Sequence, residues 1–224
     1  MTGATATAPI RLLLLDTETN GLPKNRYAPV TTPGNWPAIL QLSWTVAELH
    51  GASELRVVGR RDIGLALDPA IPWDTGAAAI HGLTEAEARR GTAPATAFAE
   101  LREALQGVQV VVAHNLAFDR PVIRAAAWAA GIKDVWPAGG TGLQELCTME
   151  LTRPLLRIPL PSDPTSGRWK APRLNELYTW LYGHVYDMSG AVLHTAQSDT
   201  HCLECCVAGL LRRGLLRCEG GRLV

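Results

Sequence analysis

Two carboxylates stand one residue apart directly after a run of four leucines. The leucines occupy residues 12–15, and Asp16 and Glu18 follow in the segment DTETNGL. Four consecutive apolar residues predict a short strand that is buried on both faces. Residues i and i+2 of a strand point to the same side, so both carboxylates can project together. Like charges this close raise each other's pKa unless a positive charge lies between them, so the pair needs a neutralising partner.

A third carboxylate, Asp119, follows another apolar run in the segment VVVAHNLAFDRP. Pro121 is tolerated near the beginning of a helix, which predicts a helix that begins near Phe118 with Asp119 in its first turn. The helix dipole favours a carboxylate there, and a plain helix-start role is one interpretation. Ile123 and Ala126, however, fall on the same side of this helix. A charge on an apolar side is costly without a partner, which favours a further role for Asp119.

A fourth carboxylate, Asp199, is expected to open the last helix, over about residues 198–213. Cys202 and Cys206 lie on the same helix face as Asp199. Asp199 is therefore also expected at the start of a helix face that points into the core. His194 lies five residues earlier, just outside the helix. An unperturbed histidine pKa of roughly 6.5 suits a general base near neutral pH, although a lone histidine is more often structural.

The four acids make sense together if divalent cations join them. Carboxylate oxygens are the ligands that Mg²⁺ and Mn²⁺ prefer, and about four negative charges match two such ions. Two divalent ions about 3.5–4 Å apart are a known device for displacement at a phosphodiester. The sequence therefore predicts a two-ion site built from Asp16, Glu18, Asp119 and Asp199, with His194 placed to take a proton from water.

The order and content of these motifs resemble the DEDDh branch of the DEDD 3′–5′ exonuclease family. The segments DTETNGL, HNLAFD and HTAQSD are similar to its three motifs, the last with the His-x4-Asp spacing, and the likeness spans about residues 11–213. This resemblance implies an α/β, ribonuclease H-like fold with a central mixed β-sheet flanked by α-helices. It also implies removal of nucleoside 5′-monophosphates from nucleic-acid 3′ ends, with DNA favoured. The four acids would be the metal ligands and His194 the general base.

The resemblance further implies a pocket for the terminal nucleotide. Its expected residues are Thr17, Leu22, Ile80, His81, Asn115 and Phe118. Leu22 would stack or wedge against a base.

The chain is expected to form one exonuclease domain over residues 10–215, with a loose N-terminal tail at 1–9 and a C-terminal tail at 216–224. Residues 40–46 alternate apolar and polar side chains, which predicts a half-buried strand paired with a third strand near 55–63. Strands early in the chain, followed by alternating helices and strands, predict a mixed sheet. Residues 152–173 are expected to be a Pro-rich loop. Its basic residues and Trp169 suit either a single-strand path or a solvated surface.

Composition limits the partners. The chain has 21 basic residues (Lys and Arg) and 21 acidic residues (Asp and Glu), so it has no net positive charge to attract phosphates from a distance. A nucleic acid would have to be held by local features. No segment reaches the roughly 18–20 apolar residues of a membrane span.

The five cysteines do not resemble a disulfide framework, and the three clustered near residues 202–206 are expected to be buried rather than to bind zinc. A cytoplasmic location is expected.

Three functions remain open at this point. The first is a DNA 3′–5′ exonuclease acting on single-stranded or frayed 3′ ends. The second is an exoribonuclease acting on RNA ends. The third is a non-catalytic, polymerase-associated subunit with the same fold, although this chain retains all five catalytic groups of the family. A polymerase partner or a homodimer is compatible with each.

Overall fold

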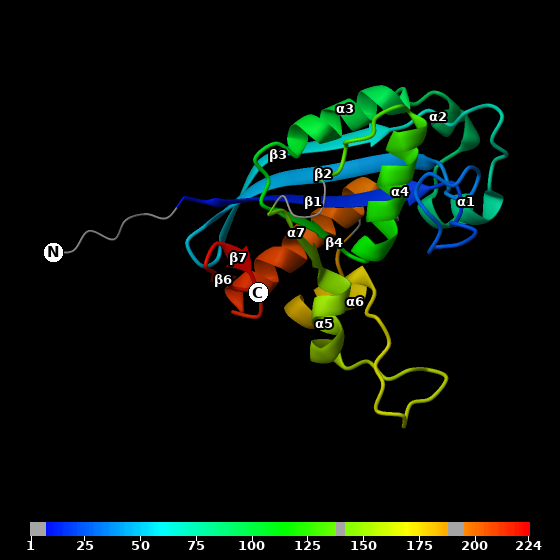
Figure 1. Ribbon diagram of the computed structural model, residues 1–224. Helices are drawn as coiled ribbons and strands as arrows, with labels where there is room; N and C mark the ends of the chain where they lie inside the picture. The colour runs from blue at the N-terminus through cyan, green and yellow to red at the C-terminus, as the bar shows by residue number, and fades with distance from the viewer. Residues whose placement is uncertain (1–7, 138–141, 188–194) are drawn as a thin grey trace.

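The computed structural model describes residues 8–137, 142–187 and 195–224. A five-stranded sheet forms its centre, in the order β3-β2-β1-β4-β5 (Figure 1). The strands are β1 (Ile10–Thr19), β2 (Ile39–His50), β3 (Glu54–Gly64), β4 (Val110–Ala113) and β5 (Gln144–Cys147). β1 pairs antiparallel with β2 and parallel with β4. The predicted mixed α/β sheet is confirmed.

Helices cover both faces of this sheet (Figure 1). They are α1 (Thr75–His81), α2 (Glu85–Arg89), α3 (Pro94–Ala104), α4 (Leu116–Ala129), α5 (Thr148–Leu156), α6 (Leu174–Tyr182) and α7 (Ala196–Arg212). α3 and α4 pack on one face, whereas α6 and α7 pack on the other. No helix in the described parts of the chain combines the length and the apolar character that crossing a membrane requires.

The alternation of β1 divides its side chains between the two helical layers. Leu13 and Leu15 belong to the core that contains α3 and α4, whereas Leu12 and Leu14 pack against α7. All four leucines are fully buried, as the apolar run predicts. Because side chains alternate, Asp16 continues the α7 side beyond Leu14.

The prediction that β2 is half-buried is wrong. Gln41, Ser43 and Thr45 are all buried, because the first turns of α7 lie over them. The backbone N–H of Ala196 donates to Gln41 Oε1 at 3.0 Å, so polar residues on this face meet the polar end of a helix rather than water. Polarity alone does not separate these two environments.

α4 begins at Leu116, two residues before the position that Pro121 suggested. At the start of the helix, the Phe118 N–H donates a hydrogen bond to the Asn115 carbonyl at 2.8 Å. Asn115 itself has a left-handed backbone conformation, with a φ of 79°. Pro121 consequently lies inside the helix, in its second turn.

One further expectation is corrected. Part of the expected loop 152–173 is helical, because α5 extends to Leu156 and includes Pro154. The C-terminal residues contain a hairpin of β6 (Cys218–Glu219) and β7 (Arg222–Leu223), whose Leu223 is buried with Leu216 in the core on the α7 face.

Candidate functional site

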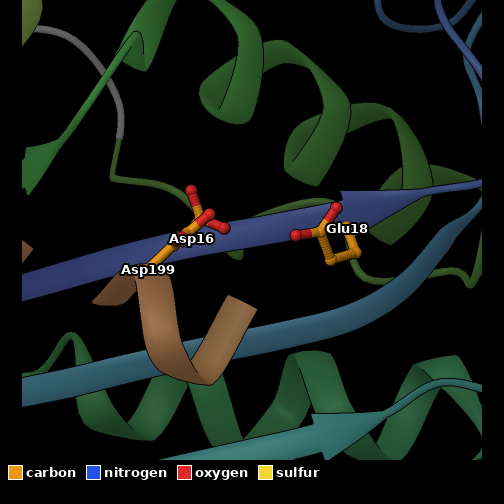
Figure 2. A group of neighbouring side chains, drawn as sticks. All are labelled: Asp16, Glu18 and Asp199. Atoms are coloured by element: carbon orange, nitrogen blue, oxygen red, sulfur yellow. The ribbon is translucent and has the colours of Figure 1, made fainter. Parts of the chain in front are cut away.

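Three carboxylates converge where β1 meets the first turns of α7. One oxygen from each of Asp16, Glu18 and Asp199 lies within 4.8 Å of the others, and all three side chains are half-buried. Figure 2 shows Asp16 and Glu18 on β1 and Asp199 on α7, gathered on the same side of the strand. Acids separated by more than 180 residues in sequence thus meet in space, as predicted.

The start of α7 is held against the sheet by a chain of hydrogen bonds. Gln41 Nε2 donates to Asp62 Oδ1 at 3.0 Å, and Gln41 Oε1 accepts from the N–H of Ala196. Thr195 caps the helix by accepting from the Ser198 N–H at 3.2 Å. Since Gln41 lies opposite Glu18 in the β1–β2 ladder, it connects the strand that carries two acids to the helix that carries the third. Sequence reasoning missed Gln41, because a polar residue on an alternating strand has the same pattern whether it faces water or the start of a helix.

Asp119 approaches the cluster from the other helical layer. It is 97% buried in the first turn of α4, and its Oδ1 accepts a hydrogen bond from Thr17 Oγ1 at 2.8 Å. Asp119 is not one of the three acids that share a single 4.8 Å group, but its charge acts on both Asp16 and Glu18. The structure therefore places all four predicted acids at one end of β1, with Thr17 as the link to the fourth.

Burial and mutual repulsion perturb these carboxyls. The pKa of Glu18 rises to about 8, first because of burial and then because of Asp199 and Asp119. Burial also raises the pKa of Asp119 to about 7, although the hydrogen bond from Thr17 opposes this shift. The pKa of Asp16 is raised well above its ordinary value by burial and by Asp119, Asp199 and Glu18. A cation would reverse these shifts, because an opposite charge favours the ionised form.

The donor set fits a hard divalent cation. Half-buried carboxylate oxygens at this spacing match the ligand preference of Mg²⁺ and Mn²⁺. Within the described residues, Asp16, Glu18 and Asp199 are the only group of acids, histidines or cysteines spaced in this way. Cys202 and Cys206 are buried, as expected. His194, the expected general base, lies outside the described residues.

The predicted pocket residues fall into two groups. Leu22 and Ile80 form the first group, with side chains that are 78% and 66% exposed. Asn20 joins their two segments, because its Nδ2 donates to the Pro72 carbonyl at 2.8 Å and its Oδ1 accepts from the Asp74 N–H at 2.9 Å. Asn20 and Asp74 were not anticipated.

Gly21 makes this close approach possible. Its φ of 102° lies in a region that side-chain-bearing residues rarely adopt, and an added Cβ would lie 2.9 Å from Asp74 Oδ2. The glycine in DTETNGL is therefore required by the turn that presents Leu22.

The other pocket residues are placed differently. His81 is almost fully buried in α1, and its Nδ1 accepts from the Leu83 N–H at 3.0 Å. Its Nε2 has no hydrogen-bond partner among the residues that the structure describes. Burial lowers the His81 pKa. Asn115 is exposed at the start of α4, and Phe118 packs partly against the core. Thr17 is buried and engaged with Asp119, which indicates a positioning role.

The segment after α5 is anchored close to α4. His114 Nε2 lies 2.9 Å from the Pro172 carbonyl, which can only accept, so this nitrogen carries the proton and Nδ1 accepts from Thr148 Oγ1 at 2.9 Å. Burial lowers the His114 pKa, which favours this neutral form. Lys170 is paired with Glu176, so this residue of the expected basic path already has a partner. The path along residues 152–173 remains a prediction.

The comparisons with known proteins place this arrangement in a structural context. The sequence matches no protein-family model and no curated protein. Among solved structures, the zinc-bound form of an Escherichia coli exonuclease I–single-stranded DNA complex aligns at a TM-score of 0.65 and 18% identity, over 91% of this chain and 41% of that one. Exonuclease I from Methylocaldum szegediense aligns at 0.63 and 21%, over 91% and 40%. A 3′-exonuclease described for histone mRNA stem-loop recognition aligns at 0.65 and 9%, over 98% and 71%.

The chain has the ribonuclease H-like fold of these exonucleases. It spans about 40% of the length of the exonuclease I chains. At identities of 9–21% the likeness shows the fold, and the shared ribonuclease H-like sheet explains how β1, α4 and α7 bring their acids to one end.

Proposed function

We propose that this protein is a metal-dependent 3′–5′ exonuclease of the DEDDh type that releases nucleoside 5′-monophosphates, with DNA as the favoured substrate. The observation that carries the proposal is the convergence of Asp16, Glu18 and Asp199 at the end of β1, with Asp119 beside them. The likeness in fold to solved exonucleases is a second line of support for the proposal.

In this proposal the four acids hold two divalent ions, Mg²⁺ or Mn²⁺. Such ions supply an activated water and stabilisation of the leaving oxygen in phosphodiester hydrolysis. The chain supplies the geometry: β1 fixes Asp16 and Glu18 on one side, Gln41 and Thr195 fix the start of α7, and Thr17 orients Asp119. Ionised carboxylates are required for ion binding, so the raised pKa values of Glu18 and Asp119 make binding dependent on pH.

His194 is the proposed general base, on the strength of its spacing to Asp199 in HTAQSD. Its role is to take the proton from the attacking water at neutral pH. Leu22 and Ile80 are proposed to contact the terminal base, because both are exposed apolar side chains on segments joined by Asn20. His81, Asn115 and Phe118 complete the proposed pocket.

RNA is the second candidate substrate. The 3′-exonuclease described for histone mRNA stem-loop recognition matches 98% of this chain and 71% of its own length, a more complete overlap than exonuclease I gives. A non-catalytic accessory subunit is disfavoured because the four acids are retained and three of them share one group.

The partners and compartment follow the same proposal. Single-stranded or frayed 3′ ends are the proposed ligand, and a polymerase or a second copy of the chain is a possible protein partner. The free cysteines are compatible with a reducing compartment such as the cytoplasm.

The test is a time course with single strands of DNA and of RNA, labelled at the 3′ or the 5′ end, with Mg²⁺, with Mn²⁺ and with EDTA. We expect immediate release of the 3′ label as mononucleotide, a ladder of shortened 5′-labelled strands, and no reaction in EDTA. The ratio of DNA to RNA rates decides between the two substrates. Absence of turnover with both nucleic acids and both metals would remove the proposal.

A further inference from the structure

The exposed side of α4 borders a groove whose first hollow lies at the start of this helix, the turn that also carries Asp119. Ala117, Arg120, Arg124 and Trp128 follow one another at helical spacing and are all exposed. Asp119, one turn from the start of the same helix, lies behind them at the cluster. We name the hollows along α4, bordered by residues 143–147 near the start of the helix and by residues 30–39 near its end, the α4 groove.

Three adjoining hollows make up the α4 groove. The first, near the start of α4, shares Arg120, Arg124 and Glu145 with a second hollow of about 740 Å³. The second shares Val30, Thr31 and Trp128 with a third, apolar hollow of about 480 Å³. The groove therefore continues along the helix from its first turn to Trp128.

The wall opposite the end of α4 belongs to the loop that follows β1. Residues 20–37 form this loop, and reciprocal bonds between Asn25 and Asn35 at 3.0 Å hold it. Trp36 Nε1 donates to the Pro29 carbonyl at 3.0 Å, which fixes the part of the loop that faces α4. This part of the wall is thus continuous with β1, which carries Asp16 and Glu18.

The charge of the groove differs from that of the whole chain, whose formal net charge is zero. Its large hollow is lined by Arg120, Arg124, Lys133 and Arg222, against two acids. The acids already have partners, because Glu145 is paired with Arg120 and Asp134 with Arg102. Arg124 is not paired in the described part of the chain, and it faces the hollow at its middle.

Trp128 supplies an aromatic surface at the far end. Its side chain is 42% exposed, and the Lys133 ammonium lies 5.0 Å from the ring centroid. Arginines that contact phosphates, followed by an aromatic platform on which a base stacks, are the features that bind single strands without sequence preference.

We infer that the α4 groove binds the 5′-ward part of the single strand whose 3′ end is at the carboxylates. Asp119 and Trp128 are nine residues apart on α4, about 13 Å along the helix axis. At roughly 3.4 Å per stacked nucleotide, this corresponds to about four nucleotides. Arg124, which faces the middle of the large hollow, contacts a phosphate along this length, and Trp128 stacks on a base near its end. The inference rests on the proposed function for the position of the 3′ end.

The test compares the double variant Arg124→Gln, Trp128→Ala with the unaltered protein on a dinucleotide and on an oligothymidylate of about twelve nucleotides. We expect KM for the oligonucleotide to rise roughly tenfold or more, with kcat and the dinucleotide kinetics unchanged. The salt dependence of oligonucleotide binding should also weaken by about 0.7 in log–log slope, because one phosphate contact is lost. The conservative pair Arg124→Lys, Trp128→Phe should restore most of the affinity. Arg56→Gln, at the far end of the sheet, should leave the kinetics on both substrates unchanged.

Fluorescence anisotropy with the 5′-labelled oligonucleotide, which needs no turnover, separates this inference from the proposed function. If the protein cleaves neither substrate but the double variant binds the oligonucleotide more weakly, the groove stands and the exonuclease proposal fails. If the protein cleaves and the double variant behaves like the unaltered protein, the groove is overturned and the exonuclease stands. Equal losses on dinucleotide and oligonucleotide, or no oligonucleotide binding by the unaltered protein, also overturn the groove.

Discussion

Thr17 Oγ1 donates a hydrogen bond to Asp119 Oδ1 at 2.8 Å and thereby joins β1 to α4 inside the protein. The two residues are 102 positions apart, and each lies beside or within the set of acids. Burial raises the Asp119 pKa, and the hydrogen bond from Thr17 lowers it, so the bond favours the ionised carboxylate. The bond also fixes the orientation of the carboxylate.

Replacing Thr17 by Val, which has nearly the same shape, removes this bond. We expect metal affinity and kcat/KM to fall about 10–100-fold, the usual cost of losing the hydrogen-bond partner of a metal ligand. The acidic limb of the pH–rate profile should move to higher pH, because the Asp119 pKa rises further. Thr17→Ser keeps the hydroxyl and should retain most of the activity. Unchanged activity and pH profile in Thr17→Val would show that Asp119 does not depend on this bond.

Gln41 has a comparable role on the other side of the sheet. Gln41→Leu leaves the Ala196 N–H and Asp62 without their partner, so we expect a loss of about 1–3 kcal/mol in the free energy of unfolding. Activity should fall as well, because the start of α7 carries Asp199. Urea unfolding and steady-state kinetics measure the two effects. Gln106→Leu, the same change on the exposed end of α3, should be nearly neutral, and equal effects at both positions would argue against a positioning role for Gln41.

The acids should make the metal-free protein less stable as pH rises. In the folded protein the Glu18 pKa is about 8 rather than 4.5, and the Asp119 pKa is about 7 rather than 3.8. At a pH between the unfolded and folded pKa values, the folded state binds more protons than the unfolded state. The contribution of Glu18 to the free energy of unfolding is therefore largest below about pH 4.5 and declines as the pH rises to about 8.

Thermal melting in EDTA across this pH range measures the effect. Glu18→Gln should flatten the decline, and Glu54→Gln, at the exposed end of β3, should not. Saturating Mg²⁺ should also flatten it, because bound cations stabilise the ionised acids. A metal-free melting temperature that rises between pH 5 and pH 8 would contradict the repulsion described here.

His194→Ala tests the proposed general base. We expect kcat to fall by about 10²–10⁴, with metal affinity unchanged, because the histidine is proposed to move a proton and not to bind the ions. His50→Ala, at the end of β2 distant from the acids, is the matched control. An undiminished rate in His194→Ala would exclude this residue from the chemical step.

The sequence predicted the acids well because their positions depend on local rules. A buried apolar run with alternating side chains is sufficient to place Asp16 and Glu18 on one side of β1, and helical periodicity is sufficient to turn Asp119 and Asp199 inward. The motif order then predicted the ribonuclease H-like fold that the structure has.

The partners of these acids could not be predicted in the same way. Thr17, Gln41 and Asn20 each act through a residue more than 50 positions away, and no local pattern specifies such a pairing. Gln41 was placed toward solvent because a polar residue on an alternating strand has the same pattern whether it meets water or the start of a helix. The C-terminal hairpin was missed for a related reason, since Leu216 and Leu223 are isolated leucines that become buried only through tertiary packing.

The most direct test of the central claim is Mn²⁺ binding, measured by calorimetry at pH 8 together with the melting temperature. The unaltered protein should bind about two ions and melt at a higher temperature when they are present, because the ions bind only where the folded chain assembles the acids. Asp16→Asn and Asp199→Asn should each lose most of this binding while remaining folded. Failure of the unaltered protein to bind Mn²⁺ or to gain thermal stability at millimolar concentration would contradict the account.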